Sequence, residues 1–190
     1  DAFASVRDGF FGGASMPHAD IVTLVERIGY EHFIQIYGMT ELHGISMTSL
    51  ASDSQEHQLT TCGKSLPGFE VQLVDPESGV VVEGVGAGEA WYKGRTHLGY
   101  EGLSETELDQ FYTPDGFFKT GDVLHRRADG RYEFITRVKD LIKVGGENVA
   151  AAEIESVLKH HPKIFNVQVV GVVDDWRGEV PAAFIEQHPE

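Results

Sequence analysis

The sequence is short of cysteine, of basic side chains and of long apolar runs. Its single cysteine, Cys62, excludes an intrachain disulfide framework and suits a reducing compartment. No apolar run approaches the roughly 18 residues that a membrane span needs, and no signal peptide is visible. We therefore predict a cytoplasmic protein that has no transmembrane segment.

Positive charge is scarce throughout the chain. Lys and Arg number 15 against 30 Asp and Glu, which gives a formal net charge of −15 with the nine histidines counted neutral. Because Lys and Arg supply the attraction to a nucleic-acid backbone, this balance argues against a nucleic-acid partner. One small phosphorylated ligand needs only local charges and stays open. The histidines show no ligand spacing with cysteine or carboxylates, so we expect no zinc site.

What is present is ordinary globular material. The 190 residues are 41% hydrophobic and 24% charged, which is enough for a buried core in one large domain or one and a half small ones. The sequence begins at Asp1 without a methionine and stops at Glu190, just after a strand-like run. From this we expect part of a longer protein.

The N-terminal part predicts a strand, a glycine turn, a helix and a second strand. We expect the helix between Pro17, which is tolerated as a first helical residue, and Gly29, which is a stop signal. Its apolar residues share one face: Ile21, Leu24, Val25 and Ile28. The second strand is expected at 32–36. In such a βαβ unit ligands bind at the carboxyl ends of the strands, where 12–14 and 37–41 lie.

From about Ile45 the pattern changes to short β-rich runs that are separated by turn clusters. The expected strands are 69–75, 88–94, 117–127 and 131–137. A short helix is expected around Glu105 to Phe111. This part predicts a small antiparallel sheet or barrel.

A third pattern begins after Arg137–Asp140. The residues predict a strand at 141–144, a turn at 145–148, a helix at 149–161 and strands at 166–173 and 181–186. The helix is expected to turn these residues inward: Ala151, Ile154, Val157 and Leu158. The pattern is typical of the start of an α+β domain, and we place a domain boundary near Lys139.

The fold class that these patterns predict is α/β. We expect the end of a βαβ layer in 1–44, a β-rich subdomain in 45–138 and the first part of a small α+β domain in 139–190.

The end of the second predicted strand carries four residues that suit a nucleotide and its metal. Tyr37 offers a flat face for a heterocycle, and Gly38 lets a ligand approach the backbone closely. Thr40 can donate a hydrogen bond to a phosphate or carbonyl oxygen, and Glu41 offers a hard oxygen to Mg²⁺. On these residues alone, a strand that ends in an ordinary polar loop is an equal alternative.

Six motifs extend this interpretation over nearly the whole chain. In order, they are FGGASMP, YGMTE, GKSLPGFEVQLVD, GEAWYKG, FFKTGDV and ITRVKDLIKVGGENVAAAEIESVL. The series resembles the adenylate-forming superfamily, which includes acyl-CoA synthetases, aryl-CoA ligases, peptide-synthetase adenylation domains and luciferases. One such motif is a weak signal, whereas six in order with suitable spacing are a strong one.

The resemblance implies an enzyme that makes an acyl-adenylate from a carboxylic acid and ATP with Mg²⁺. A thiol, usually coenzyme A, then displaces AMP. Family members have a large N-terminal domain and a small C-terminal domain that rotates between the two half-reactions. Here 1–138 would be the C-terminal part of the large domain, and 139–190 the first part of the small one.

The resemblance also assigns roles in the large domain. Thr40 would contact the phosphate of AMP, and Glu41 would hold magnesium. Tyr37 would stack on adenine. The loop of Gly12, Gly13 and Ala14 would lie along the adenine and the acyl pocket.

Five further residues receive roles in the same way. Asp122 and Arg137 would bind the ribose, and Lys139 would be the hinge of the domain rotation. Gly145 and Gly146 would face the site when the thiol attacks, where a missing Cβ leaves room for the pantetheine arm.

Each of these assignments has a plainer alternative. Asp122 could lie in a simple turn, and Arg137 and Lys139 could be ordinary linker charges. The two glycines could form only a strand–helix turn with Asn148 as the helix N-cap. The functional assignments are preferred because these alternatives must all hold together.

Two parts of the family pattern have no match in the sequence. These are the glycine-, serine- and threonine-rich phosphate loop with its lysine, and the lysine near the family's C-terminus. We therefore expect the 190 residues alone to be inactive in adenylation.

The interpretation that we adopt is part of an acyl-CoA synthetase for a fatty or medium-chain acid. Its partners would be a small carboxylic acid, ATP and coenzyme A. An adenylation domain that loads a carrier protein and a non-catalytic binding fragment remain as alternatives. The sequence gives no oligomeric state.

Overall fold

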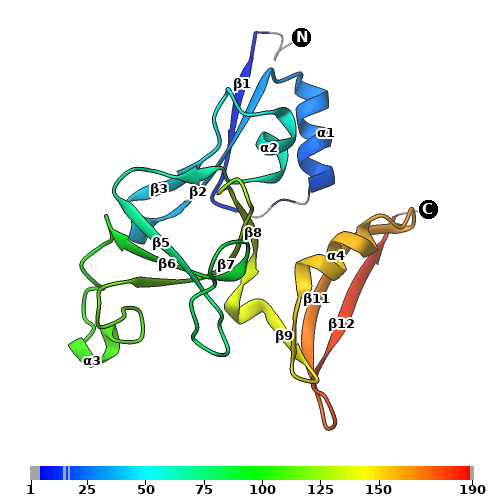
Figure 1. Cartoon of the computed structure of the whole chain (residues 1–190). Coiled ribbons are helices and arrows are strands. Elements are labelled where there is room, and N and C mark those ends of the chain that lie inside the picture. The colour runs from blue at the N-terminus through cyan, green and yellow to red at the C-terminus, as the bar shows by residue number, and fades with distance from the viewer. Residues whose placement is uncertain (1–4, 15, 17, 189–190) are drawn as a thin grey trace. The chain divides into compact units, whose positions relative to one another are not determined.

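The structure is a computed structural model that describes residues 5–14, 16 and 18–188 (Figure 1). Its residues form two compact units: Asp1–Thr120 with Leu124–Phe134, and Gly121–Val123 with Ile135–Glu190. The second unit takes in the chain from Ile135 onward, a few residues before the boundary expected near Lys139, and that boundary stays a prediction. Among the residues described, no helix has the length and apolar character that crossing a membrane requires.

The first unit begins with the predicted βαβ arrangement. Strand β1 (Asp8–Phe11) pairs in parallel with β2 (His32–Met39), and α1 (His18–Ile28) connects them (Figure 1). The apolar face of α1 packs against the sheet through buried Ile21, Val25 and Phe33. Gly29 ends the helix in the left-handed region, with φ 77°, and its N–H donates to the carbonyl of Val25. Pro17 lies outside the described residues.

Strand β2 is longer than the sequence pattern predicts. It continues through Tyr37 and Gly38 to Met39, so the prediction of a strand that stops at residue 36 was wrong. The cause is the pairing of β2 with β3 (Gly44–Thr48), whose register shifts between Tyr37 and Gly38. The short 3₁₀ turn η1 (Thr40–Leu42) joins the two strands. Together with β1 and β4 (Lys64–Ser65), these two strands form a sheet in the order β1-β2-β3-β4.

The β-rich part forms a second four-stranded sheet, as predicted. Its order is β5-β6-β7-β8, and its strands are β5 (Phe69–Val74), β6 (Gly86–Gly94), β7 (Phe118–Arg126) and β8 (Tyr132–Arg137). The core against this sheet includes the fully buried Leu73, Tyr92 and Leu124. The helix expected at 105–111 is only α3 (Glu105–Leu108), and hydrogen-bonded turns carry the chain on from it.

The second unit holds a third sheet in the order β10-β9-β12-β11. Its elements are β9 (Leu141–Val144), β10 (Glu147–Ala150), α4 (Ala151–Lys159), β11 (Ile164–Asp174) and β12 (Gly178–Gln187). The turn is therefore confined to Gly145 and Gly146, because the next four residues pair with β9.

Helix α4 differs from the prediction at its start and on one face. It begins at Ala151 and not at residue 149, and Asn148 lies in β10, so the alternative with Asn148 as N-cap was wrong. Ala151, Ile154 and Leu158 pack on the sheet as expected. Val157 is 69% exposed, because its position on the helix lies well away from that face.

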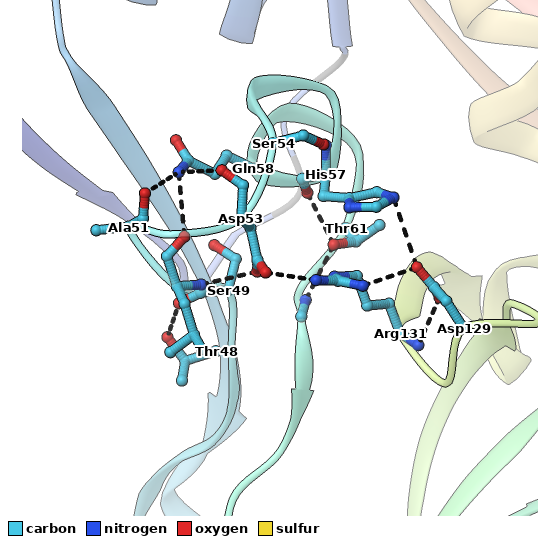
Figure 2. Close-up of polar contacts among 12 residues, drawn as sticks. Thr48, Ser49, Ala51, Asp53, Ser54, His57, Gln58, Thr61, Asp129 and Arg131 are labelled. Carbon is cyan, nitrogen blue, oxygen red and sulfur yellow. Dashed lines mark hydrogen bonds and ion pairs between the residues drawn. The ribbon is translucent and has the colours of Figure 1, made fainter.

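A buried glutamine attaches α2 (Gln55–Thr60) to the first sheet. The side chain of Gln58 is buried, and its Oε1 accepts from the backbone N–H of Phe33 at 3.0 Å. Its Nε2 donates to three carbonyls of the preceding loop: Leu50, Ala51 and Asp53 (Figure 2). The side-chain amide of Gln58 thus supplies the hydrogen-bond donor that backbone carbonyls of this irregular loop would otherwise find in a strand or a helix.

An arginine connects the same loop to the turn between β7 and β8. Arg131 pairs with Asp53 and, at 2.8 Å, with Asp129 Oδ2, which also lies 3.5 Å from His57 Nε2 (Figure 2). Burial alone would raise the pKa of Asp53, but hydrogen bonds from Arg131 and from the backbone N–H of Leu50 lower it below its usual range. The network therefore holds α2 and the β7–β8 turn together within one unit.

Replacing Arg131 with alanine is expected to destabilise this unit by about 2 kcal/mol, since the mostly buried Asp53 loses its charged partner. Urea unfolding at neutral pH measures the loss. The folded pKa of Asp53 lies below its unfolded value, so the contribution is complete above about pH 4 and fades as the pH falls further.

Arg7→Ala is the matched control, because Arg7 pairs with Glu31 on the surface and should matter by less than about 1 kcal/mol. An Arg131 variant that is no less stable than the Arg7 variant would contradict the account of this network.

Candidate functional site

The glycine loop after β1 and the polar loop after β2 lie at the same edge of the first sheet. Gly12 follows β1, and Thr40 follows β2. The two strands run parallel, with Phe11 opposite Gln35, so their carboxyl ends meet there. The structure thus places both loop segments after strand ends that point the same way, and β2 continues to Met39, beyond the level of Gly12 at Ile36.

The two positions after β1 favour glycine for different structural reasons. A Cβ on Gly12 would lie 2.3 Å from Ile36 Cγ1, so the loop packs directly on β2. Gly13 has φ 80°, a backbone angle that residues with a side chain rarely adopt, and a Cβ there would meet nothing within 4 Å. Ala14 is exposed. A ligand role for the three residues stays a prediction.

Tyr37 and Gly38 are built into the sheet. The Tyr37 ring is buried, at 7% exposure, and stacks near Tyr92 and Phe134 with centroids 6.4 and 6.5 Å away. A Cβ on Gly38 would lie 1.7 Å from the carbonyl oxygen of Gly44. The close approach that Gly38 permits here is therefore that of β3, and the adenine role of Tyr37 stays a prediction.

Thr40 and Glu41 stand at the start of η1. Thr40 is exposed and Glu41 is half-buried. Glu41 has a partner that the sequence gave no reason to expect: the hydroxyl of Tyr100 donates to its Oε1 at 2.9 Å. The backbone N–H of His97 also donates to the carbonyl of Glu41 at 2.8 Å. The loop after β6 is thus attached to the predicted metal ligand at two points.

A second tyrosine holds the histidine of this loop. Tyr112 Oη lies 2.7 Å from both His97 Nδ1 and the His97 carbonyl. A carbonyl only accepts, so both contacts are satisfied when Tyr112 donates to it and Nδ1–H donates to the phenol oxygen. His97 Nε2 is buried without a hydrogen-bond partner among the described residues.

Both phenols keep their protons at neutral pH. Burial raises the pKa of Tyr100 to about 12, and the hydrogen bond to Glu41 and its negative charge add to the effect. Burial and the charge of Glu41 likewise raise the pKa of Tyr112 against a lowering hydrogen bond from Thr96. Tyr100 is therefore a hydrogen-bond donor to the carboxyl group of Glu41.

Asp122 and Arg137 are brought together on neighbouring strands. Asp122 lies in β7 and is 5% exposed, whereas the side chain of Arg137, at the end of β8, is 54% exposed. Arg137 Nε lies 3.4 Å from Asp122 Oδ1, which is an ion-pair distance. The two residues that the resemblance assigns to one ribose are therefore neighbours, although the ribose role itself stays a prediction.

The predicted hinge and the glycine loop lie in the second unit. Lys139 is exposed in the 3₁₀ turn η2 (Val138–Asp140) between β8 and β9. Gly145 and Gly146 form the β9–β10 turn with φ 60° and 91°, and a Cβ on either would meet nothing within 4 Å. Backbone conformation alone thus explains both glycines, and their role beside a thiol stays a prediction.

Glu41 suits a metal ion that arrives with its own ligands. In the part of the chain that the structure describes, no three His, Cys, Asp or Glu side chains gather as a metal cage. Magnesium is usually held by one or two carboxylates together with substrate phosphates. A single carboxylate at the end of β2 fits that arrangement.

Family models match both parts of the chain. The model for the AMP-binding enzyme matches residues 1–100, and the model for the AMP-binding enzyme C-terminal domain matches residues 153–190.

Curated relatives match over almost the whole chain. Medium-chain acyl-CoA ligase ACSF2, mitochondrial, of Danio rerio is 34% identical over 182 residues, which are 96% of this chain and 30% of the relative. Acyl-CoA ligase SID4 of Ajellomyces capsulatus is 34% identical over 190 residues, covering 98% of this chain and 32% of the relative. The chain thus spans about a third of the length of these relatives.

Solved structures give the same result. The o-succinylbenzoate CoA synthetase MenE from Bacillus subtilis, in complex with its acyl-adenylate intermediate, has a TM-score of 0.81 and 31% identity, covering 98% of this chain and 37% of that one. ATP-bound MatB from Rhodopseudomonas palustris has a TM-score of 0.84 and 27% identity over 94% of this chain and 35% of that one. The chain belongs to the AMP-binding enzyme family.

Proposed function

We propose that this chain is part of an AMP-forming acyl-CoA synthetase. In the intact enzyme, a carboxylic acid and ATP give an acyl-adenylate and pyrophosphate, and coenzyme A then takes the acyl group and releases AMP. The observation that carries the proposal is the position of Thr40 and Glu41 at the carboxyl end of β2, in a chain whose relatives are named as acyl-CoA ligases. A fatty or medium-chain acid is the substrate class that the sequence motifs and these names favour.

Thr40 and Glu41 would act on the phosphate end of the nucleotide. The exposed hydroxyl of Thr40 would donate to the α-phosphate, on which negative charge develops as pyrophosphate leaves. Glu41 would hold magnesium together with the phosphates, and the bound ion would supply charge neutralisation there. MenE from Bacillus subtilis has been solved in complex with ATP and magnesium ion, which makes the same pairing reasonable here.

Asp122 and Arg137 would hold the ribose. The carboxylate of Asp122 can accept from two hydroxyls, and the exposed guanidinium of Arg137 lies beside it, with Nε 3.4 Å from Oδ1. Such contacts fix the sugar and so orient the phosphate for attack by the acid.

Lys139 and the glycine turn would serve the second half-reaction. A change of backbone dihedrals at Lys139 would turn the small domain, and the turn of Gly145 and Gly146 would then face the incoming thiol. The open space around both glycines is compatible with an extended ligand. A cytoplasmic location stays a prediction.

The test is acyl-CoA formation by the full-length protein. A panel of carboxylic acids is supplied with Mg-ATP and coenzyme A, and the products are identified by mass spectrometry. We expect an acyl-CoA and AMP from at least one fatty or medium-chain acid, and no turnover by the 190-residue chain. A product found only on an added carrier protein would replace the coenzyme A assignment with carrier loading.

Asp122→Ala should weaken ATP binding by at least about tenfold, since one hydrogen bond to a charged group contributes about 1.5–3 kcal/mol. Calorimetric titration of ATP measures this, with Asp109→Ala as an exposed control. Wild-type affinity in a folded Asp122 variant would reduce Asp122 to a structural residue.

A further inference from the structure

The loop after β6 is fastened to Glu41 through backbone and side chain together. His97 N–H donates to the Glu41 carbonyl at 2.8 Å, and Tyr100 Oη donates to Glu41 Oε1 at 2.9 Å. Tyr100 lies 59 residues from Glu41 in the sequence, so the contact depends on the fold. Within the described residues, Oε2 of Glu41 has no hydrogen-bond partner and is left for another ligand.

The ring of Tyr100 is itself held in place. The rings of His97 and Tyr100 make an edge-to-face contact, with centroids 4.6 Å apart and an interplanar angle of 74°. Phe111 contacts Tyr100 in a similar way at 4.9 Å and 60°. These neighbours fix the direction of the hydroxyl, because a tyrosine ring has few ways to turn once its faces are packed.

Tyr112 provides a contrast inside the same aromatic cluster. It is also a partly buried, hydrogen-bonded phenol, but its hydroxyl contacts the carbonyl and Nδ1 of His97. Removing the hydroxyl of Tyr112 costs two part-buried hydrogen bonds and removing that of Tyr100 costs one, but of the two hydroxyls only that of Tyr100 is bonded to the carboxylate of Glu41.

We propose that Tyr100 is a positioning residue for the metal ligand Glu41. Its hydroxyl holds the carboxylate in one orientation, with one oxygen occupied and the other free for the ion. The inference rests on the proposed function, in which Glu41 binds magnesium together with ATP phosphates. Outer partners of metal ligands typically change metal affinity by about 10–100-fold when they are removed.

The test uses the full-length protein with Tyr100→Phe and Tyr112→Phe. Calorimetry measures the affinity for ATP with and without magnesium, which isolates the contribution of the metal from that of the nucleotide. We expect Tyr100→Phe to lower the magnesium-dependent gain by about tenfold and to leave metal-free ATP binding unchanged. Tyr112→Phe should resemble wild type in both measurements.

A second measurement follows catalysis. The magnesium concentration for half-maximal pyrophosphate release should rise about tenfold in Tyr100→Phe, while transfer from a preformed acyl-adenylate to coenzyme A stays unchanged. If Tyr100 were merely structural, Tyr100→Phe would lower thermal stability and leave the magnesium requirement unchanged.

The outcomes separate the inference from the proposed function. A wild-type enzyme that works, beside a Tyr100→Phe variant with unchanged magnesium dependence, overturns the positioning role only. A folded wild-type protein that releases no pyrophosphate with any acid overturns the proposed function. In the 190-residue chain, the chemical shift of ¹³C-labelled Tyr100 Cζ should change in Glu41→Ala, which removes the acceptor of the Tyr100 hydroxyl, and an unchanged shift would overturn the contact itself.

Discussion

Replacing Glu41 with glutamine in the full-length protein is expected to slow adenylation by about a hundredfold, because the proposed magnesium site would lose the carboxylate that holds the ion where charge develops. Glutamine keeps the shape of the side chain and can still accept from Tyr100, whose hydroxyl lies 2.9 Å from Glu41 Oε1. The loss should therefore reflect charge rather than packing. Transfer from a preformed acyl-adenylate should change little, because the pyrophosphate and its metal have already left.

The two half-reactions are measured separately, by pyrophosphate release and by thioester formation from added acyl-adenylate. Glu26→Gln on the exposed side of α1 is the control for a lost surface charge. Equal losses in both half-reactions of Glu41→Gln would remove the metal-ligand assignment.

The second large effect concerns Lys139. Proline at this position fixes φ near about −65° and also restricts the preceding Val138. Lys139 lies exposed in η2, so little packing is lost with its side chain. We expect adenylation to survive if the fixed φ suits the orientation that this step needs. Thioester formation should fall by about a hundredfold, because the small domain could no longer place its groups for the attack of the thiol.

Lys139→Ala is the matched control, since alanine can adopt both backbone states. It should leave both half-reactions nearly intact. The melting transition of each variant shows whether the protein is still folded. The hinge role fails if proline abolishes both steps in a folded protein, or if alanine is as harmful as proline.

The elements with a clear period could be predicted from sequence. The i, i+3, i+4, i+7 spacing from Ile21 gave α1, and Gly29 gave its end, because a buried helix face and a left-handed cap leave local marks. The polar pair Thr40 and Glu41 could be placed near the end of a strand, because the apolar run before it has the local pattern of a buried strand.

What the sequence missed depends on pairing between distant segments. Residues 147–150 carry no alternation and precede a helical run, so only their pairing with β9 makes them a strand. Gly38 suggested room for a ligand, whereas the structure puts the carbonyl of Gly44 there. Tyr100 is a single aromatic residue in a loop, and nothing in the local pattern points to Glu41.

The most direct test of the central claim is acid-dependent exchange of labelled pyrophosphate into ATP by the full-length protein, without any thiol. Exchange occurs only if an acid, ATP and magnesium form an acyl-adenylate reversibly. The account predicts exchange with a fatty or medium-chain acid, and its strong loss in Glu41→Gln. No exchange with any acid in a folded, ATP-binding protein would contradict it, and so would exchange that Glu41→Gln leaves unchanged.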